Sequence, residues 1–319
     1  MSATVIVPSW NGARRLQRLL PSLGDGSEVV VVDNGSTDGT SDLLARRFPE
    51  VDVIRLARNQ GFSKAVNRAA AVASSETIVL VNDDCVCEPG FAARLAGAVD
   101  PSRGVPMAAG VLLEARDPAV IDSAGIELDD TLLVFDYLNG HPVTVLDRAV
   151  SNPLGPSGAA AAFDRSAFLE CGGFDERLFA YWEDVDLVLR LRLAGAQCVL
   201  VPDARAVHTH SATLGSGSAG KNYLTGFGRG YVLRKWTVVT GARGAIVLSR
   251  EAGLCAAQLM VDRTPSGIRG RVAGWRAAGY AQRQPYPAAA VGWSRRSIGA
   301  EVRRRMKRRR RLRRETTAA

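Results

Sequence analysis

Polar and acidic residues directly follow four short apolar runs in the first third of the chain. They are Pro8 and Asn11 after 4–7, Asp33 after 29–32, Asn59 to Gly61 after 51–56, and Asn82, Asp83 and Asp84 after 77–81. Carboxylate oxygens suit Mg²⁺ or Mn²⁺ shared with a diphosphate, where the protein supplies only one or two carboxylates. Glycines in such loops let the backbone approach a nucleotide.

A second acidic group lies further along, where Glu183, Asp184 and Asp186 begin a leucine-rich helical pattern. Acidic residues in a first helical turn complement the helix macrodipole, which would explain Glu183 or Asp186 without any chemistry. Tyr181 and Trp182 come immediately before them. We expect both aromatics to be exposed and to stack on a sugar, so we assign Tyr181, Trp182 and Glu183 to the acceptor side.

Two of the three histidines stand at His-x-His spacing, His208 and His210, after an apolar run at 197–201. A lone histidine is more often structural than a ligand. Here one of the pair could complete a metal site begun by Asp84.

The elements that position these residues alternate in type. Continuous apolar runs alternate with helical patterns at 16–23, 41–48 and 63–73. This order predicts an α/β fold with a mainly parallel sheet covered on both faces. Ligands bind at the carboxyl ends of the strands in such sheets. Each loop alone could be a simple turn, but four loops at one edge favour a nucleotide site.

Together these segments resemble the family-2 glycosyltransferases, and among them the bacterial rhamnosyltransferase-like group. The matching segments are 6–12, 30–40, 59–67, 80–84, 172–176, 183–187 and His208, within residues 3–236. The resemblance implies a GT-A nucleotide-diphospho-sugar transferase fold for residues 1–236. It also implies an inverting transferase whose donor is dTDP-rhamnose, or alternatively a UDP-linked sugar.

The resemblance further implies roles for individual residues. Asp33 would contact the nucleotide base, while Pro8 to Asn11 and Gly61 to Asn67 would shape its pocket. Asn82, Asp83 and Asp84 stand at the family's Asp-x-Asp metal motif. Because Asn82 replaces the first acid, Asp84 is the expected ligand of Mg²⁺ or Mn²⁺.

His208 matches the family's metal-binding histidine, with His210 as the second choice. Asp184 matches the catalytic base, which would deprotonate an acceptor hydroxyl on a lipid-linked or cell-envelope glycan. Arg229 lies between two glycines where relatives often have Arg-Asn, and this departure from the family pattern leaves diphosphate contacts by this segment unassigned.

The charge of the chain divides sharply along its length. Residues 1–240 hold 22 basic and 28 acidic side chains, whereas residues 241–319 hold 19 basic and 4 acidic. We expect a helical, Arg-rich extension over 237–299 and a polybasic, disordered tail over 300–319. A tail of this kind attracts anionic lipid, so we expect a cytoplasmic protein held peripherally at the inner face of the membrane. The alternative is a solvated tail.

Other classes of protein fit less well. Nucleic acid would also attract the tail, but residues 297–319 contain no aromatic side chain for base stacking. The start of the chain lacks a signal-peptide pattern, and the apolar stretch 245–261 is interrupted by Arg250 and Glu251. We therefore expect no membrane-spanning helix. A non-catalytic nucleotide-binding module remains a remote alternative, against which Asp84, Asp184 and His208 argue.

Overall fold

A computed structural model describes residues 3–24, 26–209 and 217–291. Its strands are β1 Ala3–Ser9, β2 Glu28–Asp33, β3 Asp52–Arg55, β4 Thr77–Val81, β5 Cys85–Cys87, β6 Met107–Glu114, β7 Asp117–Ser123, β8 Ile126–Leu128, β9 Val134–Asp136, β10 Ala160–Asp164 and β11 Cys198–His208. Its α-helices are α1 Ala13–Leu23, α2 Thr40–Arg47, α3 Phe62–Val72, α4 Phe91–Gly97, α5 Arg165–Glu170, α6 Glu183–Leu193, α7 Ala219–Lys235, α8 Gly241–Asp262 and α9 Ser266–Ala277. Short 3₁₀ turns lie at Pro101–Arg103, Val143–Asp147, Ala278–Tyr280 and Ala288–Ala290.

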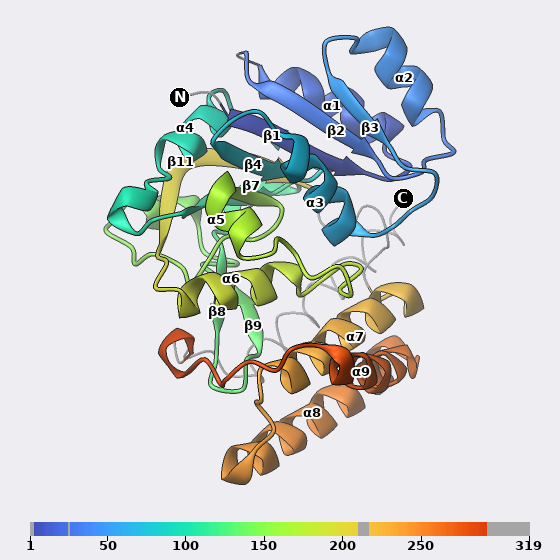
Figure 1. Ribbon diagram of the computed structural model, residues 1–319, viewed down its shortest axis with the longest axis vertical. Helices are drawn as coiled ribbons and strands as arrows, with labels where there is room; N and C mark the ends of the chain where they lie inside the picture. The colour runs from blue at the N-terminus through green and yellow to red at the C-terminus, as the bar shows by residue number, and fades with distance from the viewer. Residues whose placement is uncertain (1–2, 25, 210–216, 292–319) are drawn as a thin grey trace.

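The central sheet has the strand order β3-β2-β1-β4-β10-β6-β11-β5, with β7 paired to β6. Strands β3, β2, β1 and β4 are mutually parallel, as the sequence predicts. Strand β10 then runs antiparallel to both β4 and β6, and β5 runs antiparallel to β11. The sheet is therefore mixed rather than mainly parallel in its second half. In Figure 1 its strands β1, β2, β3 and β4 are blue to teal and its strand β11 is yellow.

Side chains alternate between the two faces of the sheet because successive residues of a strand point in opposite directions. Ile78 and Leu80 of β4 belong to one apolar core and Val79 and Val81 to the other. The first core includes apolar residues of α3, α5 and α6, and the second includes those of α1 and α4. This arrangement confirms a sheet covered on both faces.

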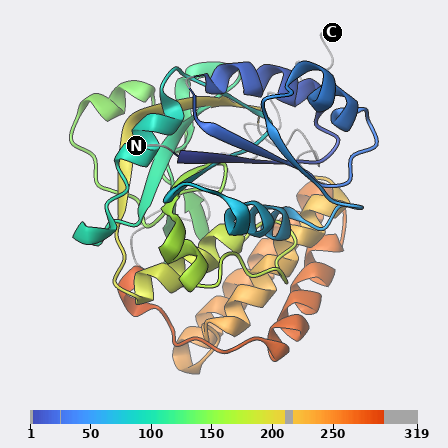
Figure 2. The same ribbon diagram turned by 45° about the horizontal axis from the view of Figure 1, so that its top comes forward.

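Helices α7, α8 and α9 form a separate layer beyond α6 (Figures 1 and 2). Glycines bring α7 and α9 into backbone contact. A Cβ at Gly230 would lie 2.0 Å from the carbonyl oxygen of Arg271, and one at Gly274 would lie 1.9 Å from that of Phe227. A side chain at either position would therefore force the helices apart. Because α7 precedes residue 236 and α9 follows it, this packing joins the proposed catalytic domain to the proposed extension.

One helix differs from the sequence-based expectation. Helix α8 is continuous over 22 residues and has an 18-residue window of mean hydropathy 1.3, so its length and composition would allow it to cross a membrane. Arg250 and Glu251 do not interrupt it. The polybasic run 303–314 and His210 lie outside the described residues.

Candidate active site

The loops after β1, β2 and β3 meet at the carboxyl edge of the sheet, as predicted. The Asn11 amide donates to Ser36 Oγ (2.8 Å), which joins the first loop to the second. Asn34 Oδ1 accepts from the Gln60 amide (2.8 Å), and Asn34 Nδ2 donates to the carbonyl of Gly61 (3.0 Å). These side-chain bonds replace the backbone ladder where the strands end, and they hold the three loops as one surface.

Asp33 and Pro8 lie at this edge, in adjacent strands. Pro8 is paired with Val32, and Asp33 with Ser9, in the parallel register of β1 and β2. Asp33 is fully buried, and its carboxylate accepts from the Ser36 amide (2.9 Å) and from Ser41 Oγ. The residue is therefore rigidly oriented by its own loop. Its contact with a nucleotide base stays a prediction.

Asp83 is held by an arginine and a serine. Arg15 binds both carboxylate oxygens, with Nε 2.9 Å from Oδ1 and Nη2 3.0 Å from Oδ2, and Ser9 Oγ donates to Oδ2 (2.6 Å). Burial raises the pKa of Asp83, while Arg15 and Ser9 oppose that shift. These bonds give Asp83 a structural role between β4 and α1. Its predicted contact with the nucleotide stays a prediction.

Asn82 and Asn67 occupy different surroundings. The Asn82 amide lies 3.4 Å from the carbonyl of Ala159, which joins the end of β4 to the start of β10. Asn67 Nδ2 donates to the carbonyl of Phe174 (2.8 Å), and its Oδ1 accepts from the Phe174 amide (2.9 Å). Asn67 thus fixes the Gly-Gly-Phe turn to α3. Nucleotide contacts by these two residues stay predictions.

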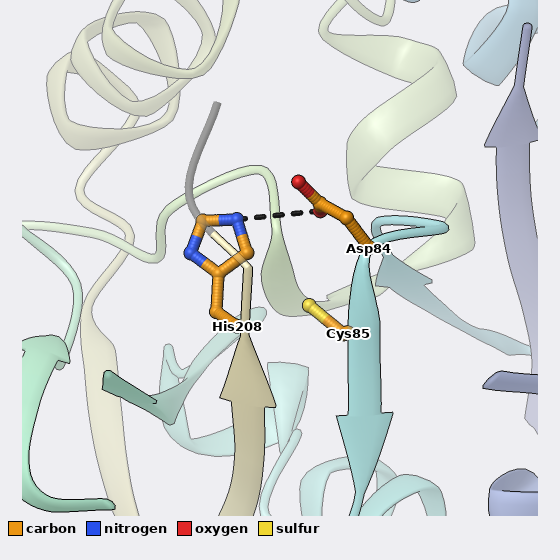
Figure 3. Close-up of side chains that lie close together, drawn as sticks. All are labelled: Asp84, Cys85 and His208. Carbon is orange, nitrogen blue, oxygen red and sulfur yellow. Dashed lines mark ion pairs between the residues drawn. The ribbon is translucent and has the colours of Figure 1, made fainter. Parts of the chain in front are cut away.

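Strand pairing brings Asp84 and His208 together, as Figure 3 shows. The antiparallel register of β5 and β11 places His208 opposite Cys85, one residue after Asp84. His208 Nε2 lies 3.3 Å from Asp84 Oδ1. Cys85 Sγ lies within 4.8 Å of the ligand atoms of both. Burial raises the pKa of Cys85 well above its ordinary value.

The ring of His208 is oriented by Asp122, a residue that the sequence analysis missed. His208 Nδ1 lies 2.7 Å from Asp122 Oδ2, and both side chains are buried. Metal-binding histidines commonly bond a carboxylate through their second nitrogen, which leaves the first nitrogen free to bind the metal. Although burial opposes protonation, Asp122 and Asp84 raise the pKa of His208 to about 9. No motif marks Asp122, because it lies inside β7 and 86 residues from His208.

The donor atoms at this place fit a divalent cation. Within the described part of the chain, the buried Asp84 Oδ1 accepts no hydrogen bond, and the group that faces it is His208 Nε2, 3.3 Å away. A buried carboxylate oxygen without a partner is costly unless a ligand occupies it. Carboxylate and imidazole ligands together suit Mn²⁺ or Mg²⁺, whereas the soft sulfur of Cys85 does not. Asp84 and His208 would hold the ion.

The start of α3 positions the segment that leads to the second acidic group. The Phe62 amide donates to the carbonyl of Phe179 (2.6 Å), and Ser63 Oγ donates to that of Leu178. A Cβ at Gly61 would lie 2.5 Å from the Phe179 oxygen, and Gly61 has φ of +92°. Gly61 therefore permits a close approach between the loop after β3 and the segment that precedes α6.

Two consecutive residues before α6 have left-handed backbone conformations, Tyr181 with φ of +69° and Trp182 with φ of +76°. Such conformations cost about 1–3 kcal/mol each in residues other than glycine, and they cluster at functional sites. Here they turn the chain sharply into the first turn of α6, which carries Glu183 and Asp184. The strain therefore lies directly beside the predicted catalytic residue.

The prediction that Trp182 is an exposed stacking residue is wrong. The turn directs its indole inward against Gly228 of α7, where there is no room for a side chain. The guanidinium of Arg229 lies over the indole, 5.4 Å from the ring centroid. Only 6% of Trp182 is exposed. Tyr181 is half-buried, and Lys221 Nζ lies 5.4 Å from its ring centroid. Burial raises the pKa of Tyr181 to about 12, with contributions from Glu183 and Asp84.

Glu183 is buried, whereas Asp184 is only half-buried. Glu183 is therefore not an open acceptor-side residue, and its Oε2 has no hydrogen-bond partner among the described residues. Asp184 Oδ2 accepts from the Gly158 amide (3.2 Å), and Oδ1 accepts from the Val185 amide (2.8 Å). Burial raises the pKa of Asp184, while these amides oppose the shift. A raised pKa makes a carboxylate a stronger base.

Asp186 and Arg229 have structural roles. Asp186 is fully buried and accepts from Lys235 Nζ (2.9 Å), Arg190 Nε (3.0 Å) and Trp236 Nε1 (3.0 Å), which fixes α6 to α7. Arg229 donates to Glu251 of α8 (2.7 Å) and to carbonyls of the loop between β8 and β9. Arg229 is thus occupied by internal bonds.

Sequence comparison places relatives along most of this chain. The family model described as Glycosyl transferase family 2 matches residues 4–107. The N-acetylglucosaminyl-diphospho-decaprenol L-rhamnosyltransferase of Mycobacterium tuberculosis (strain H37Rv) is 32% identical over 239 residues, which cover 66% of this chain and 77% of that protein. The pre-mycofactocin glycosyltransferase of the same strain is 30% identical over 227 residues, which cover 70% of this chain and 46% of that protein.

Solved structures share the fold at lower identity. GalNAc-T7, solved with UDP, GalNAc and Mn²⁺, superposes with a TM-score of 0.60 at 17% identity, over 89% of this chain and 55% of that one. The mannosyltransferase PcManGT of Pyrobaculum calidifontis, solved with GDP-Man and Mn²⁺, gives 0.51 at 22% identity, over 90% and 77%. These similarities confirm the GT-A fold.

The described site and the relatives therefore lead to one family. The rhamnosyltransferase relative is aligned over more than three quarters of its own length, and the GT-A fold matches the described strands and helices. The chain belongs to glycosyl transferase family 2 and is a nucleotide-sugar glycosyltransferase.

Proposed function

We propose that this protein is a metal-dependent, inverting glycosyltransferase. Its donor is dTDP-rhamnose and its acceptor is a lipid-linked or cell-envelope glycan. The name of the 32% identical relative, an L-rhamnosyltransferase acting on a diphospho-decaprenol-linked sugar, supports both the sugar and the class of acceptor. A UDP-linked sugar is the alternative donor.

The proposal depends on two groups of side chains, the candidate metal ligands and the acidic residues at the start of α6. Asp84 and His208 stand together at the edge of the sheet, and Glu183 and Asp184 begin α6. Tyr181 lies near both groups. Besides burial, the charges of Glu183 and of Asp84 both raise the pKa of its hydroxyl. A diphosphate held at Asp84 would therefore lie near the carboxylate that activates the acceptor.

Asp184 is the general base of the proposed reaction. It takes the proton of an acceptor hydroxyl, whose oxygen forms a bond to the anomeric carbon while the bond to the nucleoside diphosphate breaks on the opposite side. This single displacement inverts the anomeric configuration. Partial burial raises the pKa of Asp184, which favours proton transfer. A bound divalent cation would neutralise charge on the departing diphosphate.

Release of nucleoside diphosphate from a panel of nucleotide sugars tests the donor. The purified protein is incubated with Mn²⁺ or Mg²⁺ and, one at a time, dTDP-rhamnose, UDP-N-acetylglucosamine, UDP-galactose and GDP-mannose. The proposal expects slow hydrolysis of dTDP-rhamnose above the others, and loss of that activity in Asp84→Asn. Faster release from a UDP-sugar would instead support the alternative donor. Activity that is unchanged by Asp84→Asn would contradict the metal site.

The position of the protein in the cell is also part of this proposal. A lipid-linked acceptor requires the enzyme to work at a membrane surface, and the ten positive charges of residues 303–314 supply attraction to anionic lipid. A cytoplasmic, peripheral location is the prediction that follows. Specific binding to nucleic acid is not expected.

A further inference from the structure

Helix α8 has one side bound firmly to the rest of the protein. Val247 and Glu251 are buried there. Glu251 accepts from Arg229 Nε of α7 (2.7 Å) and from Arg271 Nε of α9 (2.8 Å). Arg250 Nη1 lies 3.0 Å from Asp129 Oδ2, in the loop between β8 and β9. The two charged residues in the middle of α8 therefore pair with the protein.

The opposite side of α8 is apolar and exposed to solvent. Met260 is 75% exposed, Leu248 is 58% exposed and Ile246 is 50% exposed. The exposed residues of the helix are Gly241, Ala242, Ala245, Ile246, Leu248, Ser249, Ala252, Gly253, Ala256, Leu259 and Met260. At 3.6 residues per turn, Ala242 to Met260 of this set occupy an arc of about 160°. This arc, the outer face of α8, contains no charged residue.

An uncharged, exposed helix face of this width is unusual in water and indicates a binding surface. Helix α8 lies at the end of the molecule remote from the sheet, so its outer face is open to a large partner (Figure 1). A membrane-spanning role does not fit, because the ion pairs of Arg250 and Glu251 keep α8 against α7, α9 and the β8–β9 loop. Only one face is available, as in helices that lie in a membrane interface.

The charge at the end of α8 and on the neighbouring helix α9 selects the partner. Arg263, at the end of α8, and Arg269 and Arg276 of α9 are exposed, and Trp275 and Tyr280 are exposed near them in the sequence. Arginine and aromatic side chains are the residues that bind lipid headgroups at an interface. Two copies of the chain would bring like charges together, because residues 241–319 carry 19 basic and only 4 acidic side chains.

We propose that the outer face of α8 inserts into the headgroup region of an anionic membrane, with the exposed arginines of α9 and of the end of α8 on the lipid phosphates. The chain Glu251–Arg229–Trp182 connects the inner side of α8 to the turn that carries Glu183 and Asp184. Docking through α8 would hold the catalytic acids at a fixed place relative to the lipid surface. Vesicle binding does not require sugar transfer, so it can be tested even if the proposed donor and acceptor are wrong.

The test compares the full-length wild-type chain with the double variant Ile246→Asp/Met260→Asp. Val72→Asp is the matched control, because Val72 is 65% exposed on α3, away from α8. Co-sedimentation measures binding to phosphatidylcholine vesicles with and without phosphatidylglycerol, at low and at high salt. Thermal unfolding confirms that all three proteins fold.

We expect wild type and Val72→Asp to bind anionic vesicles and to keep part of that binding at high salt, which screens charge but not apolar insertion. The double variant should bind at least about tenfold more weakly. Equal binding by the double variant, or wild-type binding that high salt abolishes, would overturn the proposal in favour of the basic tail alone. Light scattering that shows a wild-type dimer, dissociated by the double variant and without affinity for vesicles, would overturn it in favour of a second copy.

Discussion

Replacing Asp122 tests whether this residue prepares His208 to bind a metal. Asp122 Oδ2 lies 2.7 Å from His208 Nδ1, and both residues are buried, so water cannot replace the lost bond easily. With Nδ1 bonded to Asp122, Nε2 is directed at Asp84 Oδ1, 3.3 Å away. Partners of this kind typically contribute 10- to 100-fold to metal affinity. This range corresponds to about 1.4–2.7 kcal/mol.

Two substitutions divide that range. Asp122→Asn keeps an acceptor for Nδ1–H but removes the charge, so we expect a loss of Mn²⁺ affinity of about tenfold. Asp122→Ala leaves Nδ1 without this partner, so we expect a loss nearer 100-fold. Titration of the protein with Mn²⁺, followed by the electron paramagnetic resonance of the free ion, measures affinity without any sugar transfer. Asp117→Asn is the control, because Asp117 is exposed on the same strand.

The reasoning would be refuted if both Asp122 variants bound Mn²⁺ as tightly as wild type while their thermal unfolding was unchanged. That result would mean that His208 either does not bind the ion or needs no orienting partner. A loss of affinity in Asp117→Asn as large as in Asp122→Asn would show a general effect of charge in place of orientation.

Two further predictions concern the framework around the site. Gly61→Ala should lower the melting temperature and the rate of donor hydrolysis, because its Cβ would lie 2.5 Å from the Phe179 oxygen at a φ of +92°; unchanged melting would show that the two loops can separate. Burial tends to raise the pKa of Glu251, but Arg229 and Arg271 lower it below its ordinary value. The ion pairs of Glu251 therefore stabilise the folded protein fully above the pKa that Glu251 has in the unfolded chain. This stabilisation is lost as the pH falls through the lower pKa that Glu251 has in the folded protein. Urea unfolding from pH 6 to 3 should show this loss in wild type, and a weaker loss in Glu251→Gln.

Much of the nucleotide edge could be predicted from sequence because β1, β2 and β4 are built on continuous apolar runs that end in turn signals. Parallel strands then bring their carboxyl ends together without further information. The antiparallel insertion of β10 between β4 and β6 has no local signal, since Ala160–Asp164 is as apolar as a parallel strand.

The errors and omissions share a physical cause, which is that they depend on contacts between distant segments. The acidic residues next to Trp182 in the sequence suggest that it is exposed. The left-handed backbone of Tyr181 and Trp182 instead directs the indole into the core, against α7. The sequence shows that Arg250 and Glu251 break an apolar run, but not which distant segments these two charges pair with. Asp122 has no motif because only the fold brings β7 to His208.

The variant Asp184→Asn tests whether Asp184 removes the proton of the acceptor hydroxyl. Asparagine keeps the size of the side chain and an acceptor for the Gly158 and Val185 amides, but it cannot take a proton. We expect Asp184→Asn to bind the nucleotide sugar and Mn²⁺ as the wild type does. Transfer to a diphospho-polyprenol-linked acceptor should fall by about 10²–10⁴. Transfer by Asp184→Asn at the wild-type rate would show that Asp184 is not the general base.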